Sequence, residues 1–313
     1  MKRLIPLCLS IFMFSFFSGC SQQPDFDKEI THDMVLRDDY HVNEVAKSSS
    51  MLSSPCGIIC RENDILVCDE AANNIAILDL DGNYLDKIGT LGNAPLEFVR
   101  PTGIAQTEKY IYVIDSGNER IQVLDHDFIF VREIPLPHSQ ASNEYYFIDI
   151  AVTTDDCIYL STNFLDASKS RIFTVSSDEE VTEVSSQSFF GFLTAVDNEV
   201  YGTNTLVHYE TKDSQAARSG ESKLRNITMG KDISDLPYKY TPSDFVYFGN
   251  NYYCLSGLCA SLDRLDENGV YLDTLMILPS FPSVYTYLDV SRDGAFYVTD
   301  RETGLIYIVR KEE

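Results

Sequence analysis

Three features of the sequence predict an all-β fold in which six small sheets surround a central axis. A pattern of about 46 residues recurs along the chain, its segments have the composition of strands, and the last copy lacks one strand. Together these features indicate a six-bladed β-propeller whose ring is closed by a strand from the N-terminal part of the chain.

The repeat is visible as matching residues at a constant separation. Five pairs lie 46 residues apart: Pro55 and Pro101, Gly57 and Gly103, Asp69 and Asp115, Ile75 and Ile121, and Asp79 and Asp125. Tyr253 and Tyr297 follow Tyr112 at about three and four periods, and the strings DCIYLSTN and NEVYGTN supply two weaker copies, which brings the count to six. A period of this length is typical of stacked supersecondary units.

Each copy reads as strands. Segments such as YIYVI, AFYVTD and LIYIVR are rich in β-branched and aromatic residues, and Gly, Asn and Asp bound them. Several are apolar on both faces, so their sheets must be covered on both sides by other sheets. The first copy predicts strands at Gly57–Cys60, Ile65–Asp69, Ile75–Asp79 and Tyr84–Ile88, and the last predicts Leu288–Ser291, Ala295–Asp300 and Leu305–Arg310.

The last copy supplies three strands and then the sequence ends. A blade with three strands would leave an open edge, so a fourth strand must come from elsewhere in the chain. The segment around Met34 to Leu36 is expected to donate it.

The N-terminus is expected to direct export. Lys2 and Arg3 precede an apolar run from Leu4 to Phe17, which is short for a membrane span and typical of a signal peptide. The string FSGC that follows resembles a bacterial lipobox, in which Cys20 would be lipidated; a plain signal peptide is the alternative. This predicts a signal peptide over 1–19, a lipidated tether over 20–29 and the propeller over 30–313, held at a membrane surface without crossing it.

The chain is strongly acidic. Its net charge is −24 and becomes −26 on removal of residues 1–19, which contain Lys2 and Arg3 and no acidic residue. Such a surface repels nucleic acid and would favour divalent cations or basic partners, so nucleic-acid binding is excluded.

Six cysteines remain beyond Cys8 and Cys20: Cys56, Cys60, Cys68, Cys157, Cys254 and Cys259. Most lie in or beside strands, where a small buried thiol is suitable, so free thiols are favoured. The first three fall close together on neighbouring predicted strands, and one disulfide in an exported protein is the alternative. Their spacing lacks the paired form of a zinc site.

The strings RPTGIA and IYVIDSGNERIQVLD, over residues 100–105 and 111–125, resemble NHL-repeat propellers. The connector Gly89–Phe98, GTLGNAPLEF, is similar to the G-x-x-G-x-G-P-G-E-F link of six-bladed propeller lipoproteins of Bacteroidetes, with Ala94 and Leu96 in place of two glycines. The resemblance covers essentially the whole mature chain. It implies a lipoprotein of the bacterial cell envelope, periplasmic or surface-exposed on the outer membrane, in a glycan-uptake or envelope setting, and it implies no activity.

The central channel is the candidate ligand site. Six residues align on the innermost strands: Gly57, Gly103, Asp149, Thr194, Asp244 and Asp289. The four polar ones are candidate ligand-binding residues, and the carboxylates of Asp149, Asp244 and Asp289 could hold a divalent cation such as calcium. The alternative is that each aspartate caps a turn or accepts hydrogen bonds from backbone amides.

Other polar groups are assigned structural roles. Asp69, Asp115 and Asp300 end second strands, and together with Asn118 and Arg120 they are expected to stabilise turns. No histidine falls on a predicted channel strand; the five are His32, His41, His126, His138 and His208. No nucleophile elbow and no phosphate-binding loop occurs.

Two further segments stay ambiguous. The insertion over 205–240 is either a functional lid, with Tyr238 and Tyr240 towards a ligand, or a mobile loop, and its polar composition favours the loop. Tyr145, Tyr146 and Phe147 form either a sugar-stacking platform or part of the core.

These observations predict a monomeric, envelope-anchored binding or scaffold module for a protein, peptide or glycan. The alternative is a lactonase- or lyase-type propeller enzyme that uses Asp149, Asp244 and Asp289 with a divalent cation. The sequence does not identify the ligand.

Overall fold

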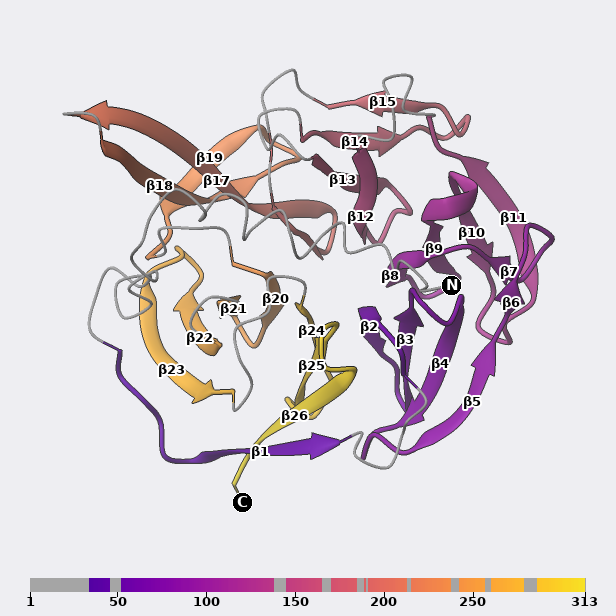
Figure 1. Ribbon diagram of the computed structural model, residues 1–313, viewed down its shortest axis with the longest axis horizontal. Coiled ribbons are helices and arrows are strands. Elements are labelled where there is room, and N and C mark those ends of the chain that lie inside the picture. The colour runs from indigo at the N-terminus through magenta and orange to yellow at the C-terminus, as the bar shows by residue number, and fades with distance from the viewer. Residues whose placement is uncertain are drawn as a thin grey trace, which may run out of the picture.

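The computed structural model shows six four-stranded antiparallel sheets arranged around a central axis, as Figure 1 shows. It describes residues 34–45, 52–137, 145–164, 170–184, 189, 191–212, 215–237, 242–256, 260–278 and 286–312. The predicted all-β, six-bladed propeller is therefore confirmed. Among these residues, no helix has the length and apolar character needed to cross a membrane.

Each blade consists of four strands that follow one another from the axis outwards. Blade 1 contains β2 (Pro55–Cys60), β3 (Asp64–Asp69), β4 (Asn74–Asp79) and β5 (Tyr84–Ile88). Blade 2 contains β8 (Pro101–Gln106), β9 (Ile111–Asp115), β10 (Arg120–Leu124) and β11 (Phe130–Pro135). Blade 3 contains β12 (Tyr145–Val152), β13 (Ile158–Phe164), β14 (Ile172–Val175) and β15 (Val181–Glu183).

The second half of the ring repeats this order. Blade 4 contains β16 (Leu193–Val196), β17 (Glu199–Lys212), β18 (Gln215–Asn226) and β19 (Lys231–Asp235). Blade 5 contains β20 (Asp244–Phe248), β21 (Asn251–Ser256), β22 (Ser261–Asp266) and β23 (Tyr271–Ile277). Blade 6 contains β24 (Thr286–Val290), β25 (Phe296–Asp300), β26 (Leu305–Lys311) and β1 (Tyr40–Val45). A short parallel ladder, β6 (Thr90–Leu91) with β7 (Glu97–Phe98), lies in the connector between blades 1 and 2.

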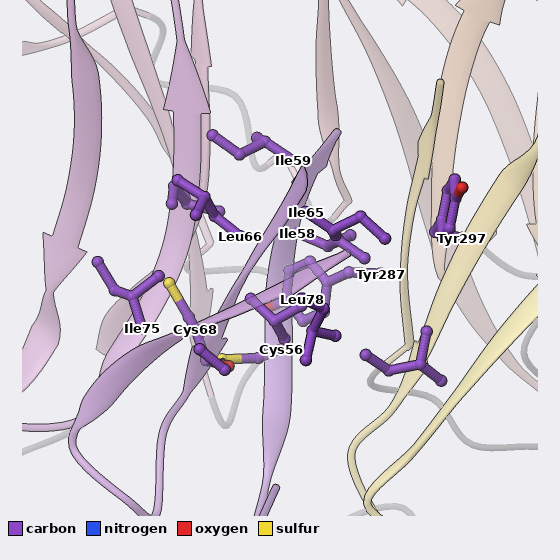
Figure 2. Close-up of a cluster of buried hydrophobic side chains, with 14 of the residues drawn as sticks. Cys56, Ile58, Ile59, Ile65, Leu66, Cys68, Ile75, Leu78, Tyr287 and Tyr297 are labelled. Carbon is purple, nitrogen blue, oxygen red and sulfur yellow. The ribbon is translucent and has the colours of Figure 1, made fainter. Parts of the chain in front are cut away.

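Burial follows the position of a strand within its blade. Every residue of β9 and β10 is buried, whereas β5 and β11 at the outer edge each contain a single buried residue. The middle strands are apolar on both faces because each sheet packs between two neighbours. Figure 2 shows side chains of blade 1, among them Ile58, Ile65 and Leu78, in one cluster with Tyr287 and Tyr297 of blade 6.

The N-terminal strand closes the ring. β1 pairs antiparallel with β26 over six residues, from Tyr40 opposite Lys311 to Val45 opposite Ile306, and lies beside β26 in Figure 1. The predicted type of closure is correct, but the predicted donor, Met34 to Leu36, is wrong. Leu36 forms a parallel bridge with Thr274 of β23 instead, so this segment extends the edge of blade 5 before the chain reaches blade 6.

The closing strand predicts a test by truncation. A chain that starts at residue 47 lacks β1, so the edge of β26 is left unpaired. The lost strand hydrogen bonds should lower the free energy of unfolding by about 3–6 kcal/mol, at about 1 kcal/mol each. Denaturant unfolding measures the difference. A chain that starts at Met34 keeps β1 and is the matched control; equal stability of the two chains would contradict closure by β1.

Candidate functional site

The predicted channel residues lie on the innermost strands, which surround the axis in Figure 1. Each innermost strand contacts the next around the ring, from β2 through β8, β12, β16, β20 and β24 back to β2. Neighbouring innermost strands belong to different sheets and share no ladder. Their backbones therefore meet either directly or through side chains that bridge them.

The register places the four polar candidates at two levels along the axis. Asp289 pairs with Tyr297, whereas the residue that pairs with the equivalent Tyr253 is Val246, two residues beyond Asp244. Asp289 therefore matches Val246 rather than Asp244. Its side chain is on the same face of the strand as that of Asp244, but two residues further along. The alignment of all six channel residues at one level was wrong.

The remaining candidates divide between the same two levels. Asp149, opposite Ser161, lies with Asp244, while Thr194, opposite Tyr201, lies with Asp289. The positions of blades 4 and 6 that match Asp149 and Asp244 are occupied by two large aromatic residues, Phe192 and Tyr287.

The three aspartates make the same pair of contacts. One carboxylate oxygen accepts the amide of the following residue: Ile150 for Asp149 at 2.9 Å, Phe245 for Asp244 at 2.7 Å and Val290 for Asp289 at 2.8 Å. The other oxygen accepts an amide from the innermost strand of the next blade: Leu193 at 2.7 Å, Leu288 at 2.8 Å and Cys60 at 2.6 Å, respectively. We call these contacts the carboxylate bridges; they join blade 3 to 4, blade 5 to 6 and blade 6 to 1.

Blades 1 and 2 carry glycine where blades 3 and 5 carry aspartate. A Cβ at Gly57 would lie 2.5 Å from the carbonyl oxygen of Thr102, so the innermost strands of blades 1 and 2 approach too closely for a side chain there. Thr102 in turn donates to the carbonyl of Phe147 in blade 3 at 3.0 Å.

Tyr287 crosses the axis. Its hydroxyl donates to the carbonyl of Ile148 at 3.1 Å, which joins blade 6 to blade 3 on the opposite side of the ring. The ring of Phe192 packs edge-on against it, with centroids 5.5 Å apart. The channel is therefore filled at this level. The sequence alignment missed Phe192 and Tyr287 because it put Thr194 and Asp289, two residues later, at their positions. An aromatic residue where other blades have Gly or Asp could have identified them.

Removal from water perturbs the pKa of all three carboxyl groups. Burial raises the pKa of Asp149 and of Asp289 from 3.8 to about 6, although the amide hydrogen bonds oppose the shift. Burial and then the negative charge of Asp149 raise the pKa of Asp244 well above 3.8. Over the described residues, none of the three carboxylates takes part in a salt bridge.

The same part of the chain contains no group of three or more His, Cys, Asp or Glu residues placed to hold a metal ion. The carboxylate bridges accept backbone amides, which is the alternative to metal binding given for these aspartates. The polar groups still accessible are at the end of the channel: Asp289 and Thr194 are partly exposed, as are Cys60 and Gln106, whose amide donates to the Cys60 carbonyl at 2.8 Å.

The residues expected to stabilise turns do so. Asp115 is fully buried and accepts the backbone amide of Val99 at 2.7 Å and the guanidinium of Arg120 at 2.9 Å. Arg120 also donates to the carbonyls of Ala94 and Glu97, so this pair anchors the connector between blades 1 and 2. Asp69 and Asp300 likewise accept backbone amides, and Asn118 donates to Asp115 and to Gly92.

The insertion over 205–240 is largely regular structure. β17 and β18 continue as a hairpin from Tyr201 opposite Asn226 to Lys212 opposite Gln215. β16 and β19 pair only with its base, so the distal part forms a two-stranded arm that projects beyond the ring in Figure 1. Over these strands the expected loop is a β-hairpin, because the pairing partner of β17 follows within the same insertion. Tyr238 and Tyr240 lie outside the described residues.

Phe147 belongs to the core: it is buried and packs edge-on against Phe173, with centroids 5.4 Å apart. Tyr145 and Tyr146 are the first two residues of β12. Among the histidines, His41 lies in β1 and His208 in the arm, and the ring of His126 contacts the carbonyl of Thr107. His32 and His138 are outside the described residues.

The carboxylate bridges predict a pH dependence of stability. Because the folded pKa of Asp149 is about 6 against 3.8, the folded chain keeps a proton that the unfolded chain releases between these values. Its contribution is therefore complete below pH 4 and is lost as the pH rises to about 6, by about 3 kcal/mol. Asp149→Asn, which cannot titrate, should show a smaller loss of stability over this range in denaturant titrations.

Asp125→Asn is the control, since Asp125 also accepts two backbone amides, from Asp127 and Ile129, but in a surface turn. If wild type and Asp149→Asn lose stability in parallel from pH 4 to 7, the assignment of this titration to Asp149 is wrong.

Comparison with known proteins agrees with the geometry. Solved structures of the same fold include streptogramin B lyase (14% identity, 87% of this chain and 98% of that chain covered, TM-score 0.59) and luciferin-regenerating enzyme (10%, 88% and 97%, 0.57). Another is a candidate exported protein of Bacteroides fragilis (13%, 90% and 98%, 0.55). No curated protein sequence matches. The model of the family described as "6-bladed beta-propeller" matches residues 45–208, just over half of the chain, and the chain belongs to this family.

Proposed function

We propose that the protein is an envelope-anchored lipoprotein that acts as a non-catalytic binding or scaffold module for a protein, peptide or glycan. The carboxylate bridges carry this proposal. Asp149, Asp244 and Asp289 each use both carboxylate oxygens on backbone amides, and Tyr287 fills the channel at the level of Asp149 and Asp244. Binding is therefore assigned to the faces of the ring rather than to its interior.

The arm of β17 and β18 favours a protein or peptide partner. Among the described residues its distal strands pair only with each other, so both outer edges carry backbone donors and acceptors that can accept a further strand. At the end of the channel, Asp289 and Thr194 offer a second polar contact region.

The alternative is a metal-dependent enzyme of the lactonase or lyase type. Two proteins of the same fold are a lyase and a luciferin-regenerating enzyme, and Asp149, Asp244 and Asp289 surround one axis. For this activity a divalent cation such as calcium would have to displace the amides that these carboxylates now accept.

Metal analysis separates the two functions. The mature chain with Cys20→Ser should contain no stoichiometric metal by mass spectrometry, and calcium or zinc should leave its Tm unchanged. Asp149→Ala with Asp289→Ala should lower the Tm, because four backbone amides lose their carboxylate acceptors, without changing the metal content. Asp125→Ala is the control for the loss of a surface carboxylate. A stoichiometric ion that is lost only in the double variant would overturn the non-catalytic proposal.

Anchoring rests on the N-terminal sequence. Lys2, Arg3 and the apolar run to Phe17 precede the lipobox-like FSGC, and a structural relative is a candidate exported protein of Bacteroides fragilis. We propose that the protein is a monomeric lipoprotein of the Bacteroidetes type. It would be lipidated at Cys20 and would face the periplasm or the exterior of the outer membrane.

Fractionation of cells tests the anchor. Cys20→Ser should move the protein from the membrane fraction to the soluble fraction, because the lipid is the expected attachment. Cys157→Ser, which alters a cysteine exposed on the propeller, is the control and should remain with membranes. Membrane association of Cys20→Ser equal to that of wild type would refute lipid anchoring.

A further inference from the structure

Two buried cysteines face each other where blade 1 begins. β2 contains a bulge, so that Cys56 and Gly57 together lie opposite one residue of β3, Cys68, between the pairs Pro55–Asp69 and Ile58–Val67. Directly opposed residues of antiparallel strands have Cα atoms about 4.5–5.5 Å apart, within the range that a disulfide spans. Figure 2 shows Cys56 and Cys68 within one cluster of buried side chains.

The contacts of the two thiols agree with this placement. The Cys56 thiol donates to the carbonyl of Cys68 at 3.2 Å and lies 3.3 Å from the carbonyl of Pro101. Burial, and next the hydrogen bond with the Cys56 side chain, raises the pKa of the Cys68 thiol well above 9. Both residues are at most 1% exposed.

We propose that Cys56 and Cys68 form a disulfide when the chain folds in an oxidising compartment. No other described pair is placed in this way. Cys60 lies four residues along β2 from Cys56, about 13 Å away, beside Asp289. Cys157 is exposed in blade 3, and Cys254 is buried in blade 5.

The reaction is thiol–disulfide exchange. A thiolate of the pair attacks a small-molecule or protein disulfide, forms a mixed disulfide and releases one thiol; the second cysteine then displaces the other thiol. Two protein thiols are oxidised, one external disulfide is reduced to two thiols, and the two protons leave with them.

The folded structure determines the stage of folding at which the disulfide can form. The raised pKa and complete burial of Cys68 keep it protonated and inaccessible in the folded chain. Oxidation must therefore precede the packing of blade 1. The inference rests on the proposed export only for the oxidising compartment, and the test below does not need export.

The disulfide would stabilise a junction of three blades. The Cys56 carbonyl accepts a hydrogen bond from Thr299 of blade 6 at 3.1 Å, and its side chain reaches Pro101 of blade 2. Cys56 thus lies beside the site where the last blade meets the first, and a covalent link to β3 would hold it there.

Refolding tests the proposal. The mature chain with Cys20→Ser contains six cysteines and should show four free thiols after refolding in a glutathione redox buffer, with a peptide that joins Cys56 to Cys68 by mass spectrometry. Its Tm should exceed that of the reduced chain by about 5 °C. The chain folded in reductant and then exposed to the same buffer should oxidise far more slowly.

Cys56→Ser should lose the linked peptide and show five free thiols, whereas Cys60→Ser should retain the link and show three. Six free thiols in the oxidatively refolded chain, or a link between Cys60 and Cys68, would overturn the proposal. If Cys56→Ser fails to fold, the peptide map of the chain that keeps both Cys56 and Cys68 still shows whether the disulfide forms. The fractionation of Cys20→Ser tests anchoring separately, so failure of one leaves the other standing.

Discussion

The structure depends on how six innermost strands meet without sharing a sheet. Their backbone amides are buried near the axis, and a buried amide without an acceptor costs about 1–3 kcal/mol. In three of the six junctions an aspartate accepts the amide of the next blade: Asp149, Asp244 and Asp289. The junction of blades 1 and 2 has no such aspartate. Gly57 lies there instead, and the two strands approach so closely that a Cβ atom at this position would clash with the backbone of blade 2.

This solution has an electrostatic cost that bears on function. Asp149 and Asp244 are buried and Asp289 is half-buried, and among the described residues no cation neutralises the three carboxyl groups, so their pKa values rise. Perturbed acids around one axis resemble a catalytic site, yet their hydrogen bonds go to the backbone and Tyr287 fills the channel at the level of Asp149 and Asp244. Perturbation here reflects a structural role, which moves the search for a ligand to the ring faces and the arm.

Closure combines several weak devices on blades 6, 1 and 2. β1 completes blade 6, Thr299 reaches blade 1, and the buried Glu70 accepts both Arg100 of blade 2 and Arg301 of blade 6. A disulfide between Cys56 and Cys68 would add a covalent element to this region. The contacts of β1, Thr299 and Arg301 join residues more than 200 positions apart in the chain, so these three form only once the ring is assembled.

The sequence by itself determined the repeat, the strands, the number of blades and the turn roles of Asp115 and Arg120, because these follow from patterns within one period. Only the tertiary structure decided which neighbour each side chain meets. The two levels of the channel depend on strand register, and the position of Tyr287 depends on a carbonyl in the opposite blade. The identity of the closing strand depends on which of two nearby segments, Met34–Leu36 or Tyr40–Val45, reaches the edge of β26. Such contacts depend on distances across the ring, and local residue preferences carry no information about them.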